Sequence, residues 1–369
     1  MLQKALILFF VVASVAGSVG CGSTSNHFVY ATIPAASQII AYREDPNSGV
    51  LTQISGSPYA VGEGAISLVL HPSGKFFYVA NPGLGGTAED DISLFTIASD
   101  GTLKEVTPRT PLGSSASQPK LLVMDAAGSF LFAMNAGSNN ISVFSIDSGS
   151  GALTQVANSP FQIGLPPLNM QLSPSGGFLF VSVAGGSAGT NNGSVAAFSV
   201  NGGALTLVGL TSTDGINPYG LAINSAGTYL YAANYGSNSI SVFTISSAGS
   251  LAPVQGSPIA AGYSAPVAMI FDPSGKYLYV ANQVSNNVAA YSISSSGLPA
   301  ALTTSTTTNA FGTESSPSFL AAEPSGKYLF VGNQGGSAGI QVFSVSNGSL
   351  TALSTYGVGN TPSSIAILK

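Results

Sequence analysis

The chain has 369 residues and a net charge of −5, and only 6% of its residues are Asp, Glu, Lys or Arg. Ordinary soluble domains have a charged share of about 25%, whereas here hydrophobic residues make up 45%. The nine Lys and Arg residues are scattered and form no basic stripe, which excludes a nucleic-acid-binding surface. A single cysteine excludes an intramolecular disulfide, so packing alone must hold the fold. A surface built from Gly, Ser, Ala, Thr and Asn is typical of an exported all-β protein.

The first residues predict an export signal. Lys4 precedes an apolar run, Ala5–Val19, that is short for a membrane span and typical of a signal peptide. We therefore assign residues 1–20 to a signal peptide, residues 21–26 to a polar spacer and residues 27–369 to one folded domain. This predicts a location outside the cytoplasm, in a bacterial cell envelope or in the medium.

Cys21 is a candidate for lipidation. It ends the sequence Ser18-Val-Gly-Cys21, which resembles the lipobox of bacterial lipoproteins, whose cysteine is acylated and becomes the mature N-terminus. Ser18 stands where that motif usually has an aliphatic residue, and chance placement is the alternative. The resemblance implies that the protein contacts a membrane only through this lipid anchor, on the periplasmic side or at the surface.

A tight turn followed by an apolar strand recurs along the chain. In Asp272–Asn282, Pro273 and Gly275 favour the turn, and Tyr277–Ala281 predicts a strand that is buried on both faces. A further strand of this kind, Phe28–Thr32, has no turn before it. The six copies with a turn are His71–Asn81, Asp125–Asn135, Ser173–Val183, Asn224–Asn234, Asp272–Asn282 and Glu323–Asn333.

Each repeat holds four strand signals in a fixed order. The apolar strand is followed by an alternating strand such as Ser239–Ile245, a hairpin turn and a weaker strand such as Leu153–Val156. A last apolar run such as Pro266–Phe271 leads into the next turn. The apolar strands begin at residues 28, 76, 130, 178, 229, 277 and 328. Repeats of about 40 to 50 residues with several short strands each are typical of propeller blades.

These repeats predict an all-β fold, a single seven-bladed β-propeller of four-stranded antiparallel blades with twenty-eight strands. The C-terminal run Pro362–Leu368 has no partner after it, and Phe28–Thr32 has none before it. Because a propeller does not end on an open edge, we expect these two segments to pair and close the ring.

The Tyr-Leu-Tyr-Val-Ala-Asn strand with its preceding Pro-Ser-Gly-Lys turn resembles the YVTN-type propeller repeat. With the Ser-Val-Phe-Ser-Ile strand and the Gly-Ala-Leu-Thr hairpin, the chain from His27 to Lys369 is similar to the lactonase family, which includes 6-phosphogluconolactonase-like and muconate-cycloisomerising members. In catalytic members of this family, an inner strand carries Pro-Arg-His, and Glu-Leu comes after the second strand that follows it. The resemblance implies that the matching positions here are the ones to compare. Here Tyr219, Gly220 and Asn234 stand at the arginine, histidine and glutamate positions.

Two residues stand out at the predicted mouth of the central channel, one place after the proline that opens an inner strand. They are Lys120 and Tyr219, and other blades have Leu168, Val267, Ser318 and Ser363 at this place. Lys120 is a candidate for binding an anion, with a solvated rim lysine as the alternative. The predicted ligand-binding residues are Lys120, Tyr219, Asn234 and Tyr235, and we assign no catalytic residue.

The remaining candidates for chemistry are isolated. His27 and His71 form neither a nucleophile–base pair nor a metal cluster in the sequence. The acidic triplet Glu89–Asp91 could hold a cation such as calcium, but no EF-hand-like spacing supports a site, and a solvated loop explains the triplet better. The asparagines that end the apolar strands suggest a polar ring, although capping of the following turns accounts for them. We expect no metal and no cofactor.

The long loops are expected on one face of the disc, and variable loops over a rigid scaffold carry binding surfaces. Because the family's catalytic positions are replaced and no other acid–base pair is evident, we expect a monomeric, non-catalytic binding or scaffold module. Its loop face would hold a cell-envelope protein or a glycan. The alternative is a lactone hydrolase or lactonising enzyme of the 6-phosphogluconolactonase-like family. The loops are Pro82–Asp90, Pro108–Gln118, Ala184–Gly193 and Thr304–Ser316.

Overall fold

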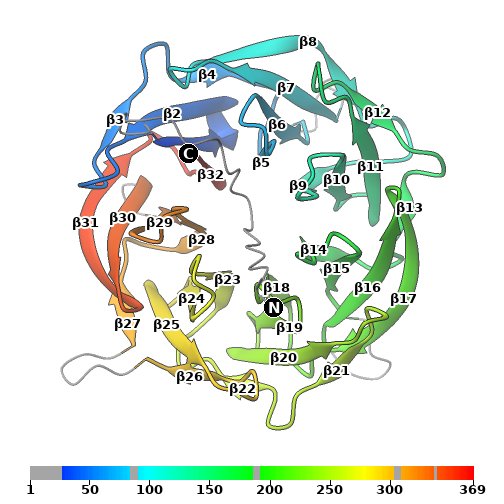
Figure 1. Cartoon of the computed structure of the whole chain (residues 1–369), viewed down its shortest axis with the longest axis vertical. Helices are drawn as coiled ribbons and strands as arrows, with labels where there is room; N and C mark the ends of the chain where they lie inside the picture. Colours follow the sequence, from blue (N-terminus) through cyan, green and yellow to red (C-terminus); the bar gives the residue numbers. More distant parts are fainter. Residues whose placement is uncertain (1–26, 84–89, 186–191, 303–308, 336–338) are drawn as a thin grey trace, which may run out of the picture.

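The computed structural model describes residues 27–83, 90–185, 192–302, 309–335 and 339–369. Over these ranges, thirty-two strands form seven antiparallel sheets arranged radially around one axis (Figure 1). The predicted seven-bladed β-propeller is confirmed, and the single helical element in the described ranges is the 3-10 turn η1 (Pro34–Ala36). No helix in these ranges has the length and apolar character needed to cross a membrane. Residues 1–26, with the predicted signal peptide, Cys21 and spacer, lie outside the described part.

Each blade has an inner strand next to the axis, then a second, a third and an outer strand. The inner strands are β5 (Ser67–Leu70), β9 (Pro119–Met124), β14 (Pro167–Leu172), β18 (Pro218–Ile223), β23 (Pro266–Phe271), β28 (Pro317–Ala322) and β32 (Ser364–Leu368). The second strands are β1 (His27–Ile33), β6 (Phe76–Asn81), β10 (Phe130–Asn135), β15 (Phe178–Val183), β19 (Tyr229–Asn234), β24 (Tyr277–Asn282) and β29 (Tyr328–Asn333). The third strands are β2 (Gln38–Glu44), β7 (Asp91–Ile97), β11 (Asn140–Ile146), β16 (Ser194–Asn201), β20 (Ser239–Ile245), β25 (Asn287–Ile293) and β30 (Gly339–Ser346).

The outer strands come in two forms, which is why the described strands outnumber the predicted twenty-eight. Three blades have one continuous outer strand, namely β8 (Leu103–Pro111), β17 (Ala204–Ser212) or β31 (Ser349–Gly357). In the other four it is divided, into β3 (Leu51–Gln53) and β4 (Tyr59–Ala60), β12 (Leu153–Gln155) and β13 (Phe161–Gln162), β21 (Leu251–Pro253) and β22 (Ile259–Ala260), or β26 (Pro299–Ala301) and β27 (Ala310–Gly312).

A Ser-Pro pair fills the gap in three of the divided outer strands. Ser57, Ser159 and Ser257 each accept at Oγ a hydrogen bond of 2.8 Å from a backbone N–H of the third strand. The proline that follows each serine has no N–H to offer to the ladder. The serine oxygen therefore takes the acceptor role that an outer-strand carbonyl has in an unbroken ladder.

In the turn before β24, the side chain of the first turn residue binds the backbone at the start of the strand. Asp272 Oδ1 accepts a hydrogen bond of 2.7 Å from the Tyr277 backbone N–H, and Gly275 adopts a φ of +71° that favours glycine. The strand that follows is buried from Leu278 to Asn282. Both of its faces therefore pack between blades, as the continuous apolar run predicts.

Buried tyrosines of the second strands join neighbouring blades. Each donates a hydrogen bond from its hydroxyl to a glycine carbonyl in the third-to-outer hairpin of the next blade. The hairpin that contains Gly101 also packs against Phe28 of the preceding blade. A Cβ on Gly101 would lie 2.4 Å from the Phe28 ring, so the contact between hairpin and ring requires glycine at this position. The pairs are Tyr30–Gly101, Tyr78–Gly151 and Tyr231–Gly297, at 2.8, 2.7 and 2.8 Å.

The ring is closed by the two ends of the folded chain. Strand β1 pairs antiparallel with β32, from Phe28 opposite Leu368 to Thr32 opposite Ser364. Figure 1 shows the red C-terminal strand beside the blue N-terminal one. The predicted closure is confirmed.

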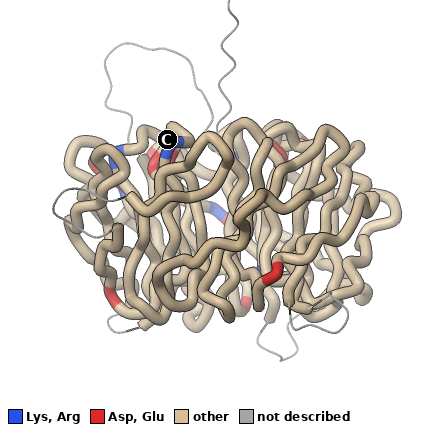
Figure 2. The backbone as a smooth tube through the Cα atoms, turned by 90° about the horizontal axis from the view of Figure 1, so that it is seen from below, with Lys and Arg blue, Asp and Glu red and all other residues tan. Residues whose placement is uncertain are grey.

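The disc has two ends, seen edge-on in Figure 2. The hairpin end carries the turns between inner and second strands and the hairpins between third and outer strands. The loop end carries the second-to-third loops and the crossings between blades. The prediction of loops was wrong for Pro108–Pro111 and Ala310–Gly312, which belong to β8 and β27, because outer-strand pairing with the third strand extends to them. Parts of Pro82–Asp90, Ala184–Gly193 and Thr304–Ser316 lie outside the described residues.

Candidate functional site

Five inner strands begin with the same irregularity. In each, a proline faces the last residue of the second strand, and the next residue is skipped in the pairing register. Proline has no N–H to donate, so the ladder is interrupted, and such a bulge turns the skipped side chain out of the regular alternation. The skipped residues are Lys120, Leu168, Tyr219, Val267 and Ser318.

The bulges place a ring of side chains at the loop end of the axis. Each skipped residue is half-buried and follows a buried proline. Ile66 and Ser363 hold the corresponding places before β5 and β32, where Ser363 Oγ donates a 2.7 Å hydrogen bond to the Ile66 carbonyl. These seven residues form the mouth ring, which combines one cation, one phenol and two hydroxyls with three aliphatic side chains. Its members are Ile66, Lys120, Leu168, Tyr219, Val267, Ser318 and Ser363.

Three of the predicted site residues meet at this ring. Lys120 and Tyr219 come from blades on either side of the β14 blade, and Lys120 Nζ lies 5.6 Å from the centroid of the Tyr219 ring. Tyr235, which follows β19, packs edge-on against Tyr219, with 5.2 Å between the centroids and 72° between the planes. An ammonium over the face of a phenol ring is attracted by the ring electrons. The amine is therefore held over Tyr219 at the mouth.

Burial changes the chemistry of Lys120. Its pKa is lowered from the ordinary value because the amine is partly withdrawn from water. Within the described ranges Lys120 forms no ion pair with a carboxylate. A lysine in this setting is neutral in a larger fraction of molecules than a solvated lysine, and a neutral amine can accept a proton.

Asn234, the fourth predicted site residue, has a different position. Its side chain is fully buried, and Nδ2 donates to the Oγ atoms of Ser239 and Ser241 on β20, at 3.0 and 2.8 Å. A Cβ on Gly215 would lie 2.3 Å from Asn234 Cγ, so the crossing between blades covers the amide. Asn234 therefore ties the second strand to the third, with its amide held by serine hydroxyls of β20.

Gly220 stands where the family resemblance implies a histidine. A Cβ there would lie 3.1 Å from the Val267 carbonyl oxygen and 3.2 Å from Ala268 Cα. These are backbone atoms of β23, which move only if the neighbouring blade shifts. A side chain at residue 220 would therefore require a shift between the two blades.

In the acidic triplet, Asp90 and Asp91 lie within the described residues, and both contact other groups of the protein. Asp90 Oδ2 accepts a 2.9 Å hydrogen bond from the Gln118 backbone N–H, and Asp91 Oδ2 lies 3.9 Å from Arg109 Nη1. Glu89 lies outside the described residues. No group of three or more His, Cys, Asp and Glu side chains in those residues is suited to hold a metal ion.

A buried acid–base cluster at the hairpin end was missed by the sequence analysis. His27 Nδ1 lies 3.1 Å from Glu323 Oε1 and 3.4 Å from Glu44 Oε2, and all three side chains are buried. These contacts with the carboxylates of Glu323 and Glu44 raise the pKa of His27 to about 9. Burial alone would raise the pKa of Glu323, but the contact with His27 and hydrogen bonds from Ser325 bring it down to about 2. Burial raises the pKa of Glu44.

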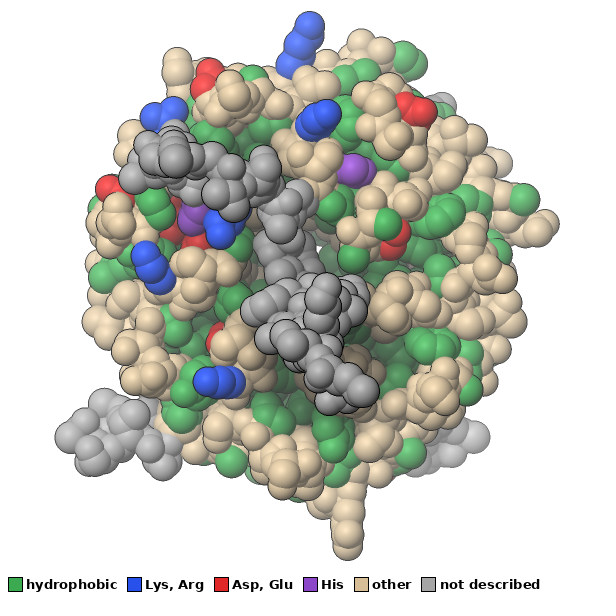
Figure 3. Space-filling view, in the orientation of Figure 1, with side chains coloured by type: hydrophobic (Ala, Val, Ile, Leu, Met, Phe, Trp, Pro, Cys, Tyr) green, Lys and Arg blue, Asp and Glu red, His purple; other side chains and the backbone are tan. Residues whose placement is uncertain are grey.

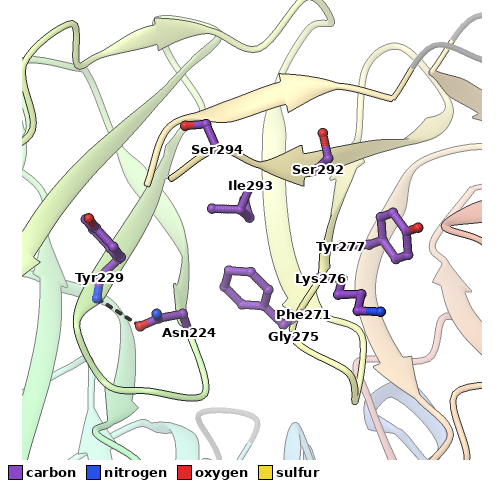
Figure 4. A pocket seen from close by; sticks show the side chains of 9 residues that line it. All are labelled: Asn224, Tyr229, Phe271, Gly275, Lys276, Tyr277, Ser292, Ile293 and Ser294. Carbon is purple, nitrogen blue, oxygen red and sulfur yellow. Dashed lines mark hydrogen bonds between the residues drawn. The ribbon is translucent and has the colours of Figure 1, made fainter. Parts of the chain in front are cut away.

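A groove at the hairpin end is distinct from the mouth ring. It has a volume of about 480 Å³, and Figure 4 shows Phe271 and Ile293 between Tyr229 and Tyr277. A similar groove of about 290 Å³ lies between the preceding pair of blades. Because the groove repeats, it follows from the packing of neighbouring blades, and we place the candidate site at the mouth ring.

Two bacterial proteins of known structure share this fold. The periplasmic gluconolactonase of Pseudomonas aeruginosa superposes with a TM-score of 0.74 at 19% identity, covering 93% of this chain and 99% of that one. A protein from Lactobacillus plantarum gives a TM-score of 0.75 at 18% identity, with coverage of 93% and 99%. At these identities the likeness shows the fold alone.

Two curated relatives are similar over part of their length. The 6-phosphogluconolactonase of Formosa agariphila is 31% identical over 131 residues, which is 34% of this chain and 36% of the relative. That of Sodalis glossinidius is 31% identical over 177 residues, which is 45% of this chain and 50% of the relative. The aligned stretches thus span half or less of these relatives.

The curated relatives and a family model contradict the predicted non-catalytic binding or scaffold module and favour the alternative, a lactone hydrolase. The prediction was wrong because the replaced family positions at 219, 220 and 234, and the lack of another evident acid–base pair, were taken to exclude catalysis. A family model described as a seven-bladed β-propeller lactonase matches residues 23–167, 169–268, 221–310 and 257–369. The chain therefore belongs to the lactonase family of seven-bladed β-propellers.

Proposed function

We propose that this protein hydrolyses a lactone at the mouth ring, with Lys120 as the general base. The observation that carries the proposal is the half-buried amine of Lys120, held 5.6 Å from the Tyr219 ring and paired with no carboxylate in the described residues. Family membership supports lactone chemistry, and relatives bear the names 6-phosphogluconolactonase and gluconolactonase.

Hydrolysis of a lactone requires a water molecule activated against the ring carbonyl. In the proposed reaction, neutral Lys120 takes a proton from water as the water oxygen bonds to the carbonyl carbon. The tetrahedral intermediate then collapses with cleavage of the ring C–O bond, and the leaving oxygen takes the proton from the Lys120 ammonium. The product is the open-chain hydroxy acid, and Lys120 returns to its neutral form.

Tyr219 and Tyr235 support this reaction in two ways. The Tyr219 ring, which packs against Tyr235, lies 5.6 Å from the Lys120 amine and holds it at the mouth, where burial lowers the pKa of Lys120. Phenol rings also combine an apolar face with a polar tip, so they suit a ligand that is a ring with hydroxyl or carbonyl groups. Gly220, which packs against β23, supplies no side chain that could act as an additional base.

The test is a pH-stat assay of lactone hydrolysis with the purified full chain and two matched variants. Lys120→Met keeps most of the apolar stem and removes the amine, and we expect kcat/KM to fall by ~10²–10⁴-fold, the usual contribution of a general base. Lys75→Met is the control, because Lys75 is an exposed lysine of a turn at the hairpin end.

Two results would refute this assignment. Rates no faster than spontaneous hydrolysis with every lactone tried would refute the function. Equal activity of wild type and Lys120→Met would leave the function standing but would remove Lys120 as the base.

We also propose that the reaction takes place outside the cytoplasm, with the protein held by a lipid on Cys21. The apolar run Ala5–Val19 and the lipobox-like sequence that ends at Cys21 support this location. Mass spectrometry of the mature protein tests it. An acylated N-terminal Cys21 is expected, and an intact Met1 with an unmodified Cys21 would contradict it.

A further inference from the structure

We propose that the mouth ring takes uncharged lactones and discriminates against phosphorylated ones. This inference rests on the proposed function and adds the class of substrate. It follows from the identity of the ring side chains and from the distribution of charge around the loop end.

The mouth ring offers a single cation to a substrate. Lys120 is one point charge, whereas sites that bind a phosphate ester favour arginine, whose fork of donors matches the phosphate oxygens. Arg109 is at the same end, but its Nε donates to Glu105 Oε1 at 2.6 Å and its Nη1 lies 3.9 Å from Asp91 Oδ2. Its charge is therefore already balanced by two carboxylates.

Lys120 is also a weak partner for a doubly charged group. Its partial burial favours the neutral amine, which is the form that the proposed reaction needs. A bound phosphate dianion would stabilise the ammonium instead and would remove the base. One lysine cannot both neutralise a phosphate and accept a proton from water, so the proposed chemistry favours a substrate without that charge.

The segments around the mouth carry further negative charge. Asp214 lies on the crossing that leads to Tyr219, Glu314 on the crossing that leads to Ser318, and Glu63 on the crossing that leads to Ile66. Asp214 and Glu314 are exposed. A phosphate ester carries a charge of about −1.5 to −2 at pH 7, so these carboxylates oppose its approach.

The hairpin end differs from this arrangement. Figure 3 views that end, where lysine and arginine side chains are interspersed with acidic ones. The lysines of the turns, Lys75, Lys276 and Lys327, are all at this end, away from the mouth ring. Electrostatic repulsion of an anionic substrate is therefore expected at the loop end, where the mouth ring lies, more than at the hairpin end.

The experiment compares kcat/KM of the full chain for uncharged glucono-1,5-lactone and δ-valerolactone with that for 6-phosphoglucono-1,5-lactone, at low and high ionic strength. We expect at least one uncharged lactone to be preferred over the phosphorylated one by about tenfold or more at low salt. Salt should raise kcat/KM for the phosphorylated lactone and leave that for the uncharged lactones unchanged, because it screens repulsion.

A matched pair of double variants isolates the charge effect. Asp214→Asn with Glu314→Gln removes two exposed carboxylates on crossings that lead to the mouth ring. Asp100→Asn with Asp147→Asn removes two exposed carboxylates at the hairpin end. The first pair should raise kcat/KM for the phosphorylated lactone several-fold at low salt, and the second should not.

The outcomes separate this inference from the proposed function. Faster hydrolysis of the phosphorylated lactone than of both uncharged ones would overturn the substrate class and leave the lactonase function intact. Equal responses of the two double variants would overturn the charge argument. Hydrolysis of none of the three lactones would overturn the function, and this inference with it.

Discussion

Replacement of His27 by glutamine should lower the folding stability of the propeller at neutral pH. Above pH 9 the variant and the wild type should differ little. The side chain of His27 lies between Glu323 and Glu44, at 3.1 and 3.4 Å, where it joins the last blade to the first. Glutamine keeps a hydrogen-bond donor but carries no charge. It leaves two buried carboxylates next to each other without a cation.

The magnitude follows from the pKa of His27, which rises from 6.5 to about 9 in the folded protein. At about 1.4 kcal/mol for each pH unit, this difference corresponds to roughly 3 kcal/mol of stability. Because the folded pKa lies above the unfolded one, this stability is fully present below pH 6.5 and is lost as the pH rises to about 9.

The two glutamates define the rest of the pH dependence. Glu323, with a folded pKa of about 2, contributes stability above its ordinary value of 4.5 that is lost as the pH falls toward 2. Glu44 has a raised pKa, so its contribution declines as the pH rises above 4.5. Tyr328 faces the same carboxylates, and their charges contribute to the rise in its own pKa after burial. The stabilisation by the cluster should therefore be greatest between pH 4.5 and 6.5.

Urea unfolding of wild type, His27→Gln, Glu323→Gln and the double variant at pH 5.5, 7.5 and 9.5 measures the effect. The coupling energy between the two residues should be large at pH 5.5 and small at pH 9.5. His71→Gln is the control, because His71 contacts Ser73 Oγ and the Gly128 carbonyl, and not a carboxylate. A coupling energy that does not change with pH would refute the reasoning.

Two further predictions concern the fold. Deletion of residues 364–369 removes β32, which exposes the edge of β1 and removes packing from both neighbouring blades. Size-exclusion chromatography should therefore show aggregates. A monomer with an unchanged melting curve would contradict the closure. Gly220→Ala introduces a Cβ against backbone atoms of β23 at 3.1 and 3.2 Å, and overpacking of this kind costs about 1–3 kcal/mol, visible as a lower melting temperature. Gly209→Ala, where a Cβ meets nothing within 4 Å, is the matched control, and equal melting temperatures of the two variants would contradict the packing at residue 220.

The sequence predicted the second and third strands well because their patterns are local. The turn of Pro273 and Gly275 and the apolar run after it determine β24, and the alternating residues of β20 determine its bounds. The outer strands were harder, because Ser57, Ser159 and Ser257 replace part of the strand while keeping its acceptor role. Where a serine side chain replaces a backbone acceptor, the outer strand loses its alternating pattern, so its bounds cannot be predicted from sequence periodicity.

The candidate site was predicted in part. The proline before Lys120 and Tyr219 is the visible signal of the bulge, so both were placed at the mouth, and the structure brings them together. The burial of Asn234 under Gly215 was not visible, since it depends on the path of a crossing between blades. The cluster of His27, Glu44 and Glu323 was missed because its members are close only once the ring is closed.

The pH dependence of kcat/KM tests the role of Lys120 most directly. After subtraction of spontaneous hydrolysis, wild type should show kcat/KM rising with pH as Lys120 loses its proton. The midpoint should lie below the ordinary lysine pKa of about 10.4, because burial lowers the pKa of Lys120. Lys120→Met should show a low rate without this rise. A wild-type profile without such a rise, or the same rise in Lys120→Met, would contradict the account.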